Sequence, residues 1–176
     1  MAATGSAATG AARSTRVGFF AGSCDPPTLG HLELVSRAAA IVDRLVIGVG
    51  VNADKTPWLS LEERLGLLSE LLPSGVSAAP FTGLAVEAAR RAGATLLLRG
   101  VRSEADLAVE LQMALANRRL APELETVVLV GSPEVAHISS RLVREVHAGG
   151  GDVGHFVPPL VAQFLARRRA APGGGR

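Results

Sequence analysis

The sequence predicts one α/β domain, a Rossmann-like, doubly wound fold with a five-stranded parallel sheet. Short apolar runs alternate with longer segments whose apolar residues have helical spacing, as in strands joined by crossover helices. Aromatic residues make up only 3% of the chain, so the core is aliphatic, which suits strands buried on both faces. A length of 176 residues fits one such domain.

The strands are expected where apolar runs are short and nearly continuous. Connections between parallel strands of one sheet are right-handed, so successive runs joined by helices imply a doubly wound sheet. Ligands bind such sheets beyond the carboxyl ends of the strands, which makes the loops after the first, second, fourth and fifth strands the candidate site. The runs are Val17–Ala21, Leu45–Val51, Val76–Pro80, Thr95–Leu98 and Thr126–Val130.

The helices are expected where apolar residues recur every three or four positions. Ser60 and Glu63 have the spacing of a capping box, in which each side chain satisfies a backbone N–H of the first turn. Gly93 follows a helix as a C-terminal stop, and Pro158 lies in the first turn of the last helix. The expected helices are Leu29–Ala40, Ser60–Leu72, Gly83–Ala92, Ser103–Leu120, Ser139–His147 and Pro158–Arg169.

The two ends differ in composition from the middle. Residues 1–15 are rich in Ala, Gly, Ser and Thr, and residues 170–176 are rich in Pro and Gly, so both are expected to be disordered around a domain over 16–169. No apolar run approaches the roughly 18–20 residues of a membrane span, and the features of a signal peptide are missing. We therefore expect a cytoplasmic protein without a membrane partner.

Charge and cysteine content exclude several classes. The nominal charge is +2, but residues 16–166 hold 13 basic against 16 acidic side chains, since five arginines lie in the two ends. There is no basic stripe with interleaved aromatic residues, so nucleic-acid binding is not expected. Cys24 is the only cysteine, which excludes an internal disulfide and a cysteine metal cluster.

The loop after the first strand, Gly22–His31, is suited to phosphate binding. Gly22 permits a tight turn, Gly30 permits close approach of the backbone, and His31 falls in the first turn of the next helix. Helix-start amides and an imidazole together can bind phosphate oxygens. A lone histidine is more often a capping or core residue, but its place after the first strand favours function. Cys24 in this loop has no obvious base nearby and is expected to serve packing.

Two further loops carry isolated cations. Lys55, after the second strand, is the only lysine beside 17 arginines, and its compact ammonium can follow a moving phosphate. Arg99 and Arg102, separated by Gly100 and Val101, suit a phosphate clamp after the fourth strand. Each of these could instead be an ordinary surface residue. Glu110 follows on the next helix, where it could contact a ribose or adenine.

The loop after the fifth strand contains His137, Ile138, Ser139, Ser140 and Arg141. Ser139 is expected to cap the following helix in any case. The hydroxyls, the helix-start amides and Arg141 or Arg144 also have the chemistry of an anion cradle. Neither a GxxxxGK[ST] loop nor a GxGxxG loop occurs, which argues against P-loop and dinucleotide-binding proteins.

Taken in order, these segments resemble bacterial phosphopantetheine adenylyltransferase, of the HIGH-motif nucleotidyltransferase superfamily. The resemblance runs from about Arg16 to Arg168. The Thr-Leu-Gly-His element ending at His31 is shared by many nucleotidyltransferases. More specific is the combination of Arg99-Gly100-Val101-Arg102, the helix with Asp106 and Glu110, and Pro122-Glu123-Leu124-Glu125.

The resemblance implies adenylyl transfer from ATP to 4′-phosphopantetheine with Mg²⁺, giving dephospho-CoA and pyrophosphate, reversibly, in coenzyme A synthesis. It implies a homo-oligomer, a hexamer built as a dimer of trimers. Mg²⁺ is expected on phosphate and water oxygens, with no protein side chain as a ligand. By matching positions, the catalytic residues are His31, Lys55 and Arg99. The phosphopantetheine contacts are Ser23, Lys55, Ala85 and Arg99, and the ATP contacts are Ser23, Cys24, His31, Gly100, Val101, Arg102, Glu110, Val135, Ala136, His137, Ile138, Ser139, Ser140 and Arg141.

Several positions depart from the family pattern. Cys24 stands in place of Phe, Pro27 in place of an aliphatic residue, and Leu29 in place of a polar one. Arg141 stands where a third Ser is common, and Ala85 is smaller than usual. These departures concern the nucleotide loop and the acceptor contacts, while the catalytic His, Lys and Arg are kept.

Two alternatives remain open from the sequence. One is another enzyme of the same fold, acting on nicotinate mononucleotide or glycerol phosphate, against which the Arg99–Arg102 and Pro122–Glu125 segments argue. The other is a nucleotide-binding module without catalysis, in which His31, Lys55 and Arg99 would not all be needed. Turnover of phosphopantetheine distinguishes all three.

Overall fold

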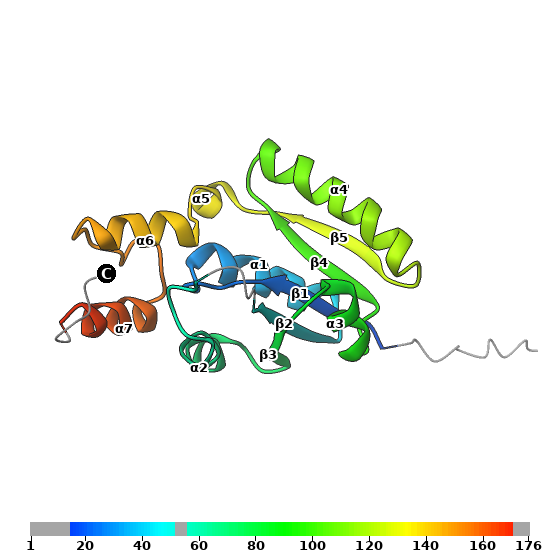
Figure 1. The fold of residues 1–176 in the computed structure, drawn as a ribbon, viewed down its shortest axis with the longest axis horizontal. Helices are drawn as coiled ribbons and strands as arrows, with labels where there is room; N and C mark the ends of the chain where they lie inside the picture. Colours follow the sequence, from blue (N-terminus) through cyan, green and yellow to red (C-terminus); the bar gives the residue numbers. More distant parts are fainter. Residues whose placement is uncertain (1–14, 52–55, 171–176) are drawn as a thin grey trace, which may run out of the picture.

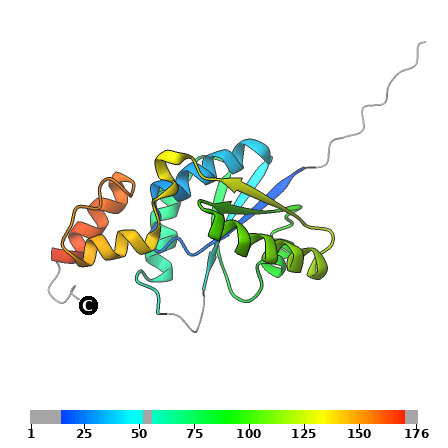
Figure 2. The same cartoon turned by 90° about the horizontal axis from the view of Figure 1, so that it is seen from above.

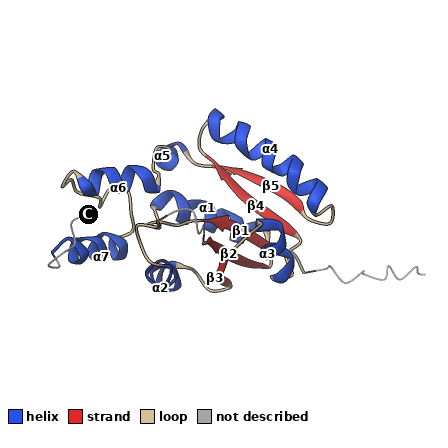
Figure 3. Cartoon of the chain, viewed as in Figure 1, coloured by secondary structure: helices blue, strands red, loops and turns tan. Residues whose placement is uncertain are grey.

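The structure is a computed structural model that describes residues 15–51 and 56–170. As the sequence predicts, it has one five-stranded sheet in which every neighbouring pair of strands is parallel (Figures 1 and 3). The strand order is β3-β2-β1-β4-β5. Within these ranges no helix combines the length and apolar character needed to cross a membrane. The strands are β1 Val17–Gly22, β2 Arg44–Gly50, β3 Val76–Phe81, β4 Leu96–Val101 and β5 Glu125–Val130.

Helices cover both faces of the sheet. The side chains of β1 alternate between them: Phe20 joins the cluster under α1 and α2, whereas Phe19 and Ala21 join the cluster under α3 and the end of α4. This double burial explains why β1 and β2 are continuous apolar runs. The helices are α1 Leu29–Ile41, α2 Leu61–Leu71, α3 Ala85–Arg91, α4 Glu104–Leu120, α5 Pro133–Ala136, α6 Ser140–Ala148 and α7 Pro159–Ala170.

The last two helices form a separate layer beyond the carboxyl end of the sheet (Figures 1 and 2). A third apolar cluster joins Val143 of α6 and Leu165 of α7 to two leucines of another segment. These are Leu59, just before α2, and Leu67, within α2. The cluster therefore holds α6 and α7 next to the loops that follow the strands, where the ligand site of a doubly wound fold is expected.

The structure corrects the predicted end of the fourth strand. Arg99, Gly100 and Val101 belong to β4 and pair in parallel with β5, and only Arg102 follows the strand. The apolar run stops at Leu98 because Arg99 and Gly100 follow it. The strand continues through them because the backbone hydrogen bonds of a sheet do not depend on the type of side chain. The short helix α5 was not expected either.

The tight turn after β1 is also displaced. Gly22 is the last residue of the strand, and the left-handed backbone conformation falls on Cys24, with φ of 48°. A non-glycine residue at positive φ is uncommon and is held there by its surroundings. The expected disorder of the chain ends concerns residues 1–15 and 170–176, of which only Thr15 and Ala170 lie in the described ranges. Ala170 is the last residue of α7, so the predicted start of the tail is one residue too early.

Candidate active site

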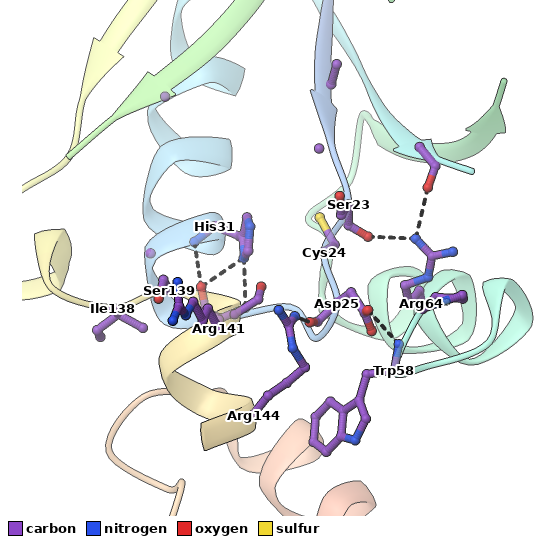
Figure 4. A pocket seen from close by; sticks show the side chains of 18 of the residues that line it. Ser23, Cys24, Asp25, His31, Trp58, Arg64, Ile138, Ser139, Arg141 and Arg144 are labelled. Atoms are coloured by element: carbon purple, nitrogen blue, oxygen red, sulfur yellow. Dashed lines mark hydrogen bonds between the residues drawn. The ribbon is translucent and has the colours of Figure 1, made fainter. Parts of the chain in front are cut away.

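A pocket of about 900 Å³ opens beyond the carboxyl ends of β1, β2 and β4 (Figure 4). β1 lies between β2 and β4, so the chain leaves β1 in one direction and returns to the sheet on its other side at β4. This is the switch point at which doubly wound sheets bind ligands. Ten predicted site residues line the pocket: Ser23, Cys24, His31, Arg99, Gly100, Arg102, Ile138, Ser139, Ser140 and Arg141.

His31 caps helix α1 and also faces the pocket. Thr28 is the N-cap residue; its side chain accepts from the His31 amide, while the Thr28 backbone N–H donates to His31 Nδ1 at 3.1 Å. The Thr28 hydroxyl also lies 2.8 Å from Nδ1. A backbone N–H can only donate, so Nδ1 accepts and a neutral ring carries its proton on Nε2. His31 therefore has the capping role that the sequence left open. Because the cap uses Nδ1, the Nε2–H remains as a donor for the pocket.

The electrostatic environment keeps this ring neutral. Burial of the ring, followed by the nearby positive charge of Arg102, lowers the pKa of His31 from 6.5 to about 4. At neutral pH the imidazole is consequently uncharged. The neutral ring keeps one N–H, on Nε2, with which it can donate a hydrogen bond to an anion.

Arg99 is fixed at the end of β4 by a bidentate ion pair with Glu110 of α4. Its Nε and Nη2 donate to the two carboxylate oxygens at 2.7 and 2.6 Å, and Nη1 donates to the Ala21 carbonyl at 3.0 Å. Two parallel hydrogen bonds between a guanidinium and a carboxylate fix the orientation of the arginine side chain. Glu110 is 9% exposed and does not line the pocket, so in this structure it orients Arg99.

Arg102 connects two loops of the site. Its Nε donates to Asp106 at 3.2 Å, and its Nη1 donates to the Ile138 carbonyl at 3.1 Å. Beyond it, Ser139 caps α6 by accepting from the Leu142 amide, as predicted. The loops after β4 and β5 therefore meet beside His31 at one edge of the pocket (Figure 4).

The loop after β1 is held by contacts from two other segments. The two carboxylate oxygens of Asp25 accept from the amides of Trp58 and Leu59 at 2.8 Å each. The Asp25 carbonyl accepts from Arg144 at 2.5 Å, and the Pro26 carbonyl accepts from the Ser140 hydroxyl at 2.8 Å. These bonds tie the loop to the start of α2 and to α6.

Cys24 has a structural environment. It is 2% exposed, and burial raises the pKa of its thiol to about 12, against the opposing charge of Arg64 and with a smaller contribution from the charge of Asp25. The thiol stays protonated at neutral pH and is a poor nucleophile. The prediction that Cys24 serves packing agrees with this environment.

Other predicted residues lie away from the pocket lining. Val101 is buried in β4, Ala85 begins α3, and Val135, Ala136 and His137 belong to α5 and its end. Lys55, predicted to be catalytic, lies outside the described residues. Nothing in the structure therefore bears on its position.

Sequence reasoning missed several residues that line the pocket. Asp25 and Thr28 lie within the singled-out loop but were given no role, although their hydrogen-bonding groups were visible. Arg64 and Arg168 come from helices, and helical spacing alone does not say which arginine turns inward. The missed lining residues include Asp25, Thr28, Trp58, Arg64 and Arg168.

Within the described residues there is no group of three or more His, Cys, Asp or Glu side chains that could hold a metal ion. The pocket is instead lined by hydroxyls, one imidazole and several guanidinium groups. This donor-rich lining suits an anionic ligand.

Comparison with known proteins agrees with the architecture. Residues 19–146 match the family model described as Cytidylyltransferase-like. Among solved structures, the bifunctional NMN adenylyltransferase/ADP ribose pyrophosphatase of Francisella tularensis has a TM-score of 0.66 at 13% identity, over 89% of this chain and 50% of that one. At that identity the likeness concerns the fold alone.

Curated relatives are much closer in sequence. The phosphopantetheine adenylyltransferase of Beijerinckia indica is 44% identical over 89% of this chain and 98% of its own length. That of Parvibaculum lavamentivorans is 46% identical over 86% of this chain and 94% of its own length. The chain therefore belongs to the phosphopantetheine adenylyltransferase family, within the cytidylyltransferase-like proteins.

Proposed function

We propose that this protein transfers an adenylyl group from ATP to 4′-phosphopantetheine, reversibly, giving dephospho-CoA and pyrophosphate in coenzyme A synthesis. The observation that carries the proposal is the pocket at the switch point, where a neutral His31 and the guanidinium groups of Arg99 and Arg102 come together. Family membership supplies the substrates, and a cytoplasmic location is part of the same proposal.

The reaction is an in-line displacement at the α-phosphorus of ATP. An oxygen of the acceptor phosphate forms the new bond, the bond to the β-phosphate oxygen breaks, and pyrophosphate leaves with the bonding electrons. No covalent enzyme intermediate is required, and catalysis comes from alignment and charge neutralisation. The protonated, buried thiol of Cys24 is consistent with a site that uses no nucleophile.

His31 would act as a hydrogen-bond donor in this displacement. Nδ1 accepts from Thr28 and thereby fixes the ring. The Nε2–H would donate to an α-phosphate oxygen as charge develops on it. Arg99, oriented by Glu110, would hold the acceptor phosphate. Lys55 is proposed from the resemblance to bridge the reacting phosphates.

The nucleotide is proposed to lie along the edge formed by the loops after β4 and β5. Ser23, Gly100, Arg102 and the Ile138–Arg141 segment would contact it directly, because all of them line the pocket. Cys24 lines it as well. Residues outside the lining would hold these contact residues in place, namely Val101, Glu110 and Val135–His137. Ala85 would contact the pantetheine arm.

Mg²⁺ would enter with the ATP phosphates. Magnesium keeps several water ligands and binds phosphate oxygens readily, so it does not need a dedicated set of protein side chains. Its chemistry would be to neutralise the triphosphate and the leaving pyrophosphate. Removal of divalent cations with EDTA should abolish turnover, and added Mg²⁺ should restore it.

We also propose that the protein self-associates through helix α4, in line with the hexamer that the resemblance implies. The helix directs Glu110 and Asn117 inward and leaves Leu107, Leu111 and Leu115 47%, 58% and 61% exposed. A surface helix normally buries its apolar side chains and exposes its polar ones. Exposed leucines at spacings of four residues support a protein partner on this face.

The test of the activity is pyrophosphate release from ATP and 4′-phosphopantetheine with Mg²⁺. Turnover is expected with this acceptor and not with nicotinate mononucleotide or glycerol phosphate. Activity on either of those acceptors alone would contradict the proposal. Binding of ATP without turnover of any acceptor would favour a non-catalytic nucleotide-binding module.

A further inference from the structure

The arginines that line the pocket divide into two classes by their charge partners. Two of them, Arg64 and Arg144, have no carboxylate within ion-pair distance among the described residues. Arg144 donates to the Asp25 carbonyl. The other four are each paired with an acidic side chain: Arg99 with Glu110, Arg102 with Asp106, Arg141 with Glu145 and Arg168 with Glu63.

Arg64 is the more deeply buried of the two unpaired cations. It is 3% exposed, in the first turn of α2. Its Nη1 donates to the carbonyls of Ser23 at 2.9 Å and Gly50 at 3.1 Å, and its Nε donates to the Ser60 carbonyl at 3.4 Å. Its Nη2 has no hydrogen-bond partner among the described residues, although the residue lines the pocket.

Carbonyl dipoles stabilise a buried guanidinium but do not cancel its charge. Buried charges in proteins are normally paired, because removing an ion from water costs more than neutral hydrogen bonds return. The nearby carboxylate of Asp25 is already engaged by the amides of Trp58 and Leu59. Among the residues that the structure describes, the charge of Arg64 therefore has no acidic partner, and a ligand that enters the pocket can supply one.

The position of Arg64 indicates which ligand this is. It joins the carboxyl ends of β1 and β2, whereas His31 lies on the other side of the Ser23–Asp25 segment, next to the loops proposed for ATP (Figure 4). We infer that Arg64 is a ligand of the acceptor's phosphate, so that it selects a phosphorylated pantetheine over pantetheine itself. The inference rests on the proposed function.

The experiment compares two ligands that differ only in the phosphate. Dissociation constants of 4′-phosphopantetheine and of pantetheine are measured by calorimetry for the wild type, Arg64→Gln and Arg64→Lys. Loss of a charge-assisted hydrogen bond should weaken phosphopantetheine binding by about 10- to 100-fold in Arg64→Gln. Pantetheine binding should change by less than about threefold, and Arg64→Lys should lie between wild type and Arg64→Gln.

Arg44→Gln is the matched control. Arg44 begins β2 at the opposite end of the sheet and likewise donates to a carbonyl, that of Ala92 at 2.8 Å. Arg44→Gln should change neither dissociation constant.

The KM for ATP should also stay within about threefold of wild type in Arg64→Lys. This variant keeps the charge and provides a folded protein if Arg64→Gln is unstable.

The outcomes separate the inference from the proposed function. Equal weakening of phosphopantetheine and pantetheine, or a change confined to ATP, would show that Arg64 only supports the fold or serves the nucleotide, and would overturn the inference. A wild-type protein that neither binds phosphopantetheine nor releases pyrophosphate would overturn the proposed function itself. A selective loss for the phosphorylated ligand supports both.

Discussion

At the scale of single residues, His31 combines a structural and a chemical role in one ring. Nδ1 completes the capping box of α1 with Thr28, and this bond fixes both the tautomer and the orientation of the ring. Glu or Gln usually occupies this capping position. With His there, the same bond that stabilises the helix also leaves Nε2 as a donor for the pocket.

Stability should depend on pH through His31. Its folded pKa of about 4 lies below its ordinary 6.5, so between these values the unfolded chain binds more protons than the folded one. The free energy of unfolding should therefore rise with pH across this window, and the contribution should be complete above pH 6.5. Urea unfolding at pH 5 and pH 7 should differ by about 2 kcal/mol more in wild type than in His31→Asn. Identical pH dependence in the two proteins would contradict the neutral ring.

Removal of the His31 side chain should affect catalysis more than binding. A donor whose hydrogen bond strengthens as negative charge develops acts mainly in the transition state. We expect His31→Ala to lower kcat by about 100-fold or more, with KM for ATP changed by less than about fivefold. Steady-state kinetics of pyrophosphate release measures both. If instead only KM rose, His31 would be a positioning residue.

At the scale of elements, Asp25 joins the loop after β1 to the start of α2. Both carboxylate oxygens accept backbone amides from this neighbouring segment, at Trp58 and Leu59. An asparagine has a single acceptor oxygen, so one buried amide would lose its partner. Asp25→Asn should lower the free energy of unfolding by about 1–3 kcal/mol, measured by urea denaturation.

Asp152→Asn is the control for this effect. Its carboxylate accepts from the Gly154 amide at 2.8 Å in an exposed turn, where water can replace the lost bond. We expect a change of about 0.5 kcal/mol or less. Equal losses in the two variants would mean that the Asp25 contacts add no stability beyond that of a surface turn.

At the scale of the whole molecule, α4 should determine the oligomeric state. A carboxylate at Leu111 would have to be desolvated in any interface formed by this exposed apolar face, at a cost of several kcal/mol. Leu111→Glu should therefore shift the mass in solution toward the monomer, measured by light scattering after gel filtration. Leu84→Glu, on a comparably exposed leucine at the start of α3, should leave the mass unchanged. A monomeric wild type would contradict the proposed self-association.

The number of strands and their places along the chain could be read from the sequence because each buried strand is a distinct apolar run between helices. The predicted strands and long helices are confirmed, with ends shifted by a few residues. The largest shift is at β4, where Arg99 and Gly100 pair within the sheet. Apolar pattern marks buried side chains, whereas strand ends depend on backbone pairing, which leaves no mark in residue type.

The sequence by itself determined the parallel α/β fold, the loops that form the site and the family, because these depend on local patterns and ordered motifs. Only the tertiary structure decided which charges in the site are compensated. Glu110 neutralises Arg99 across eleven positions, while Arg64, within the described part of the chain, donates only to the carbonyls of Ser23, Gly50 and Ser60. Such pairing depends on how distant elements are brought together, and it is the basis for the proposal that Arg64 binds a substrate phosphate.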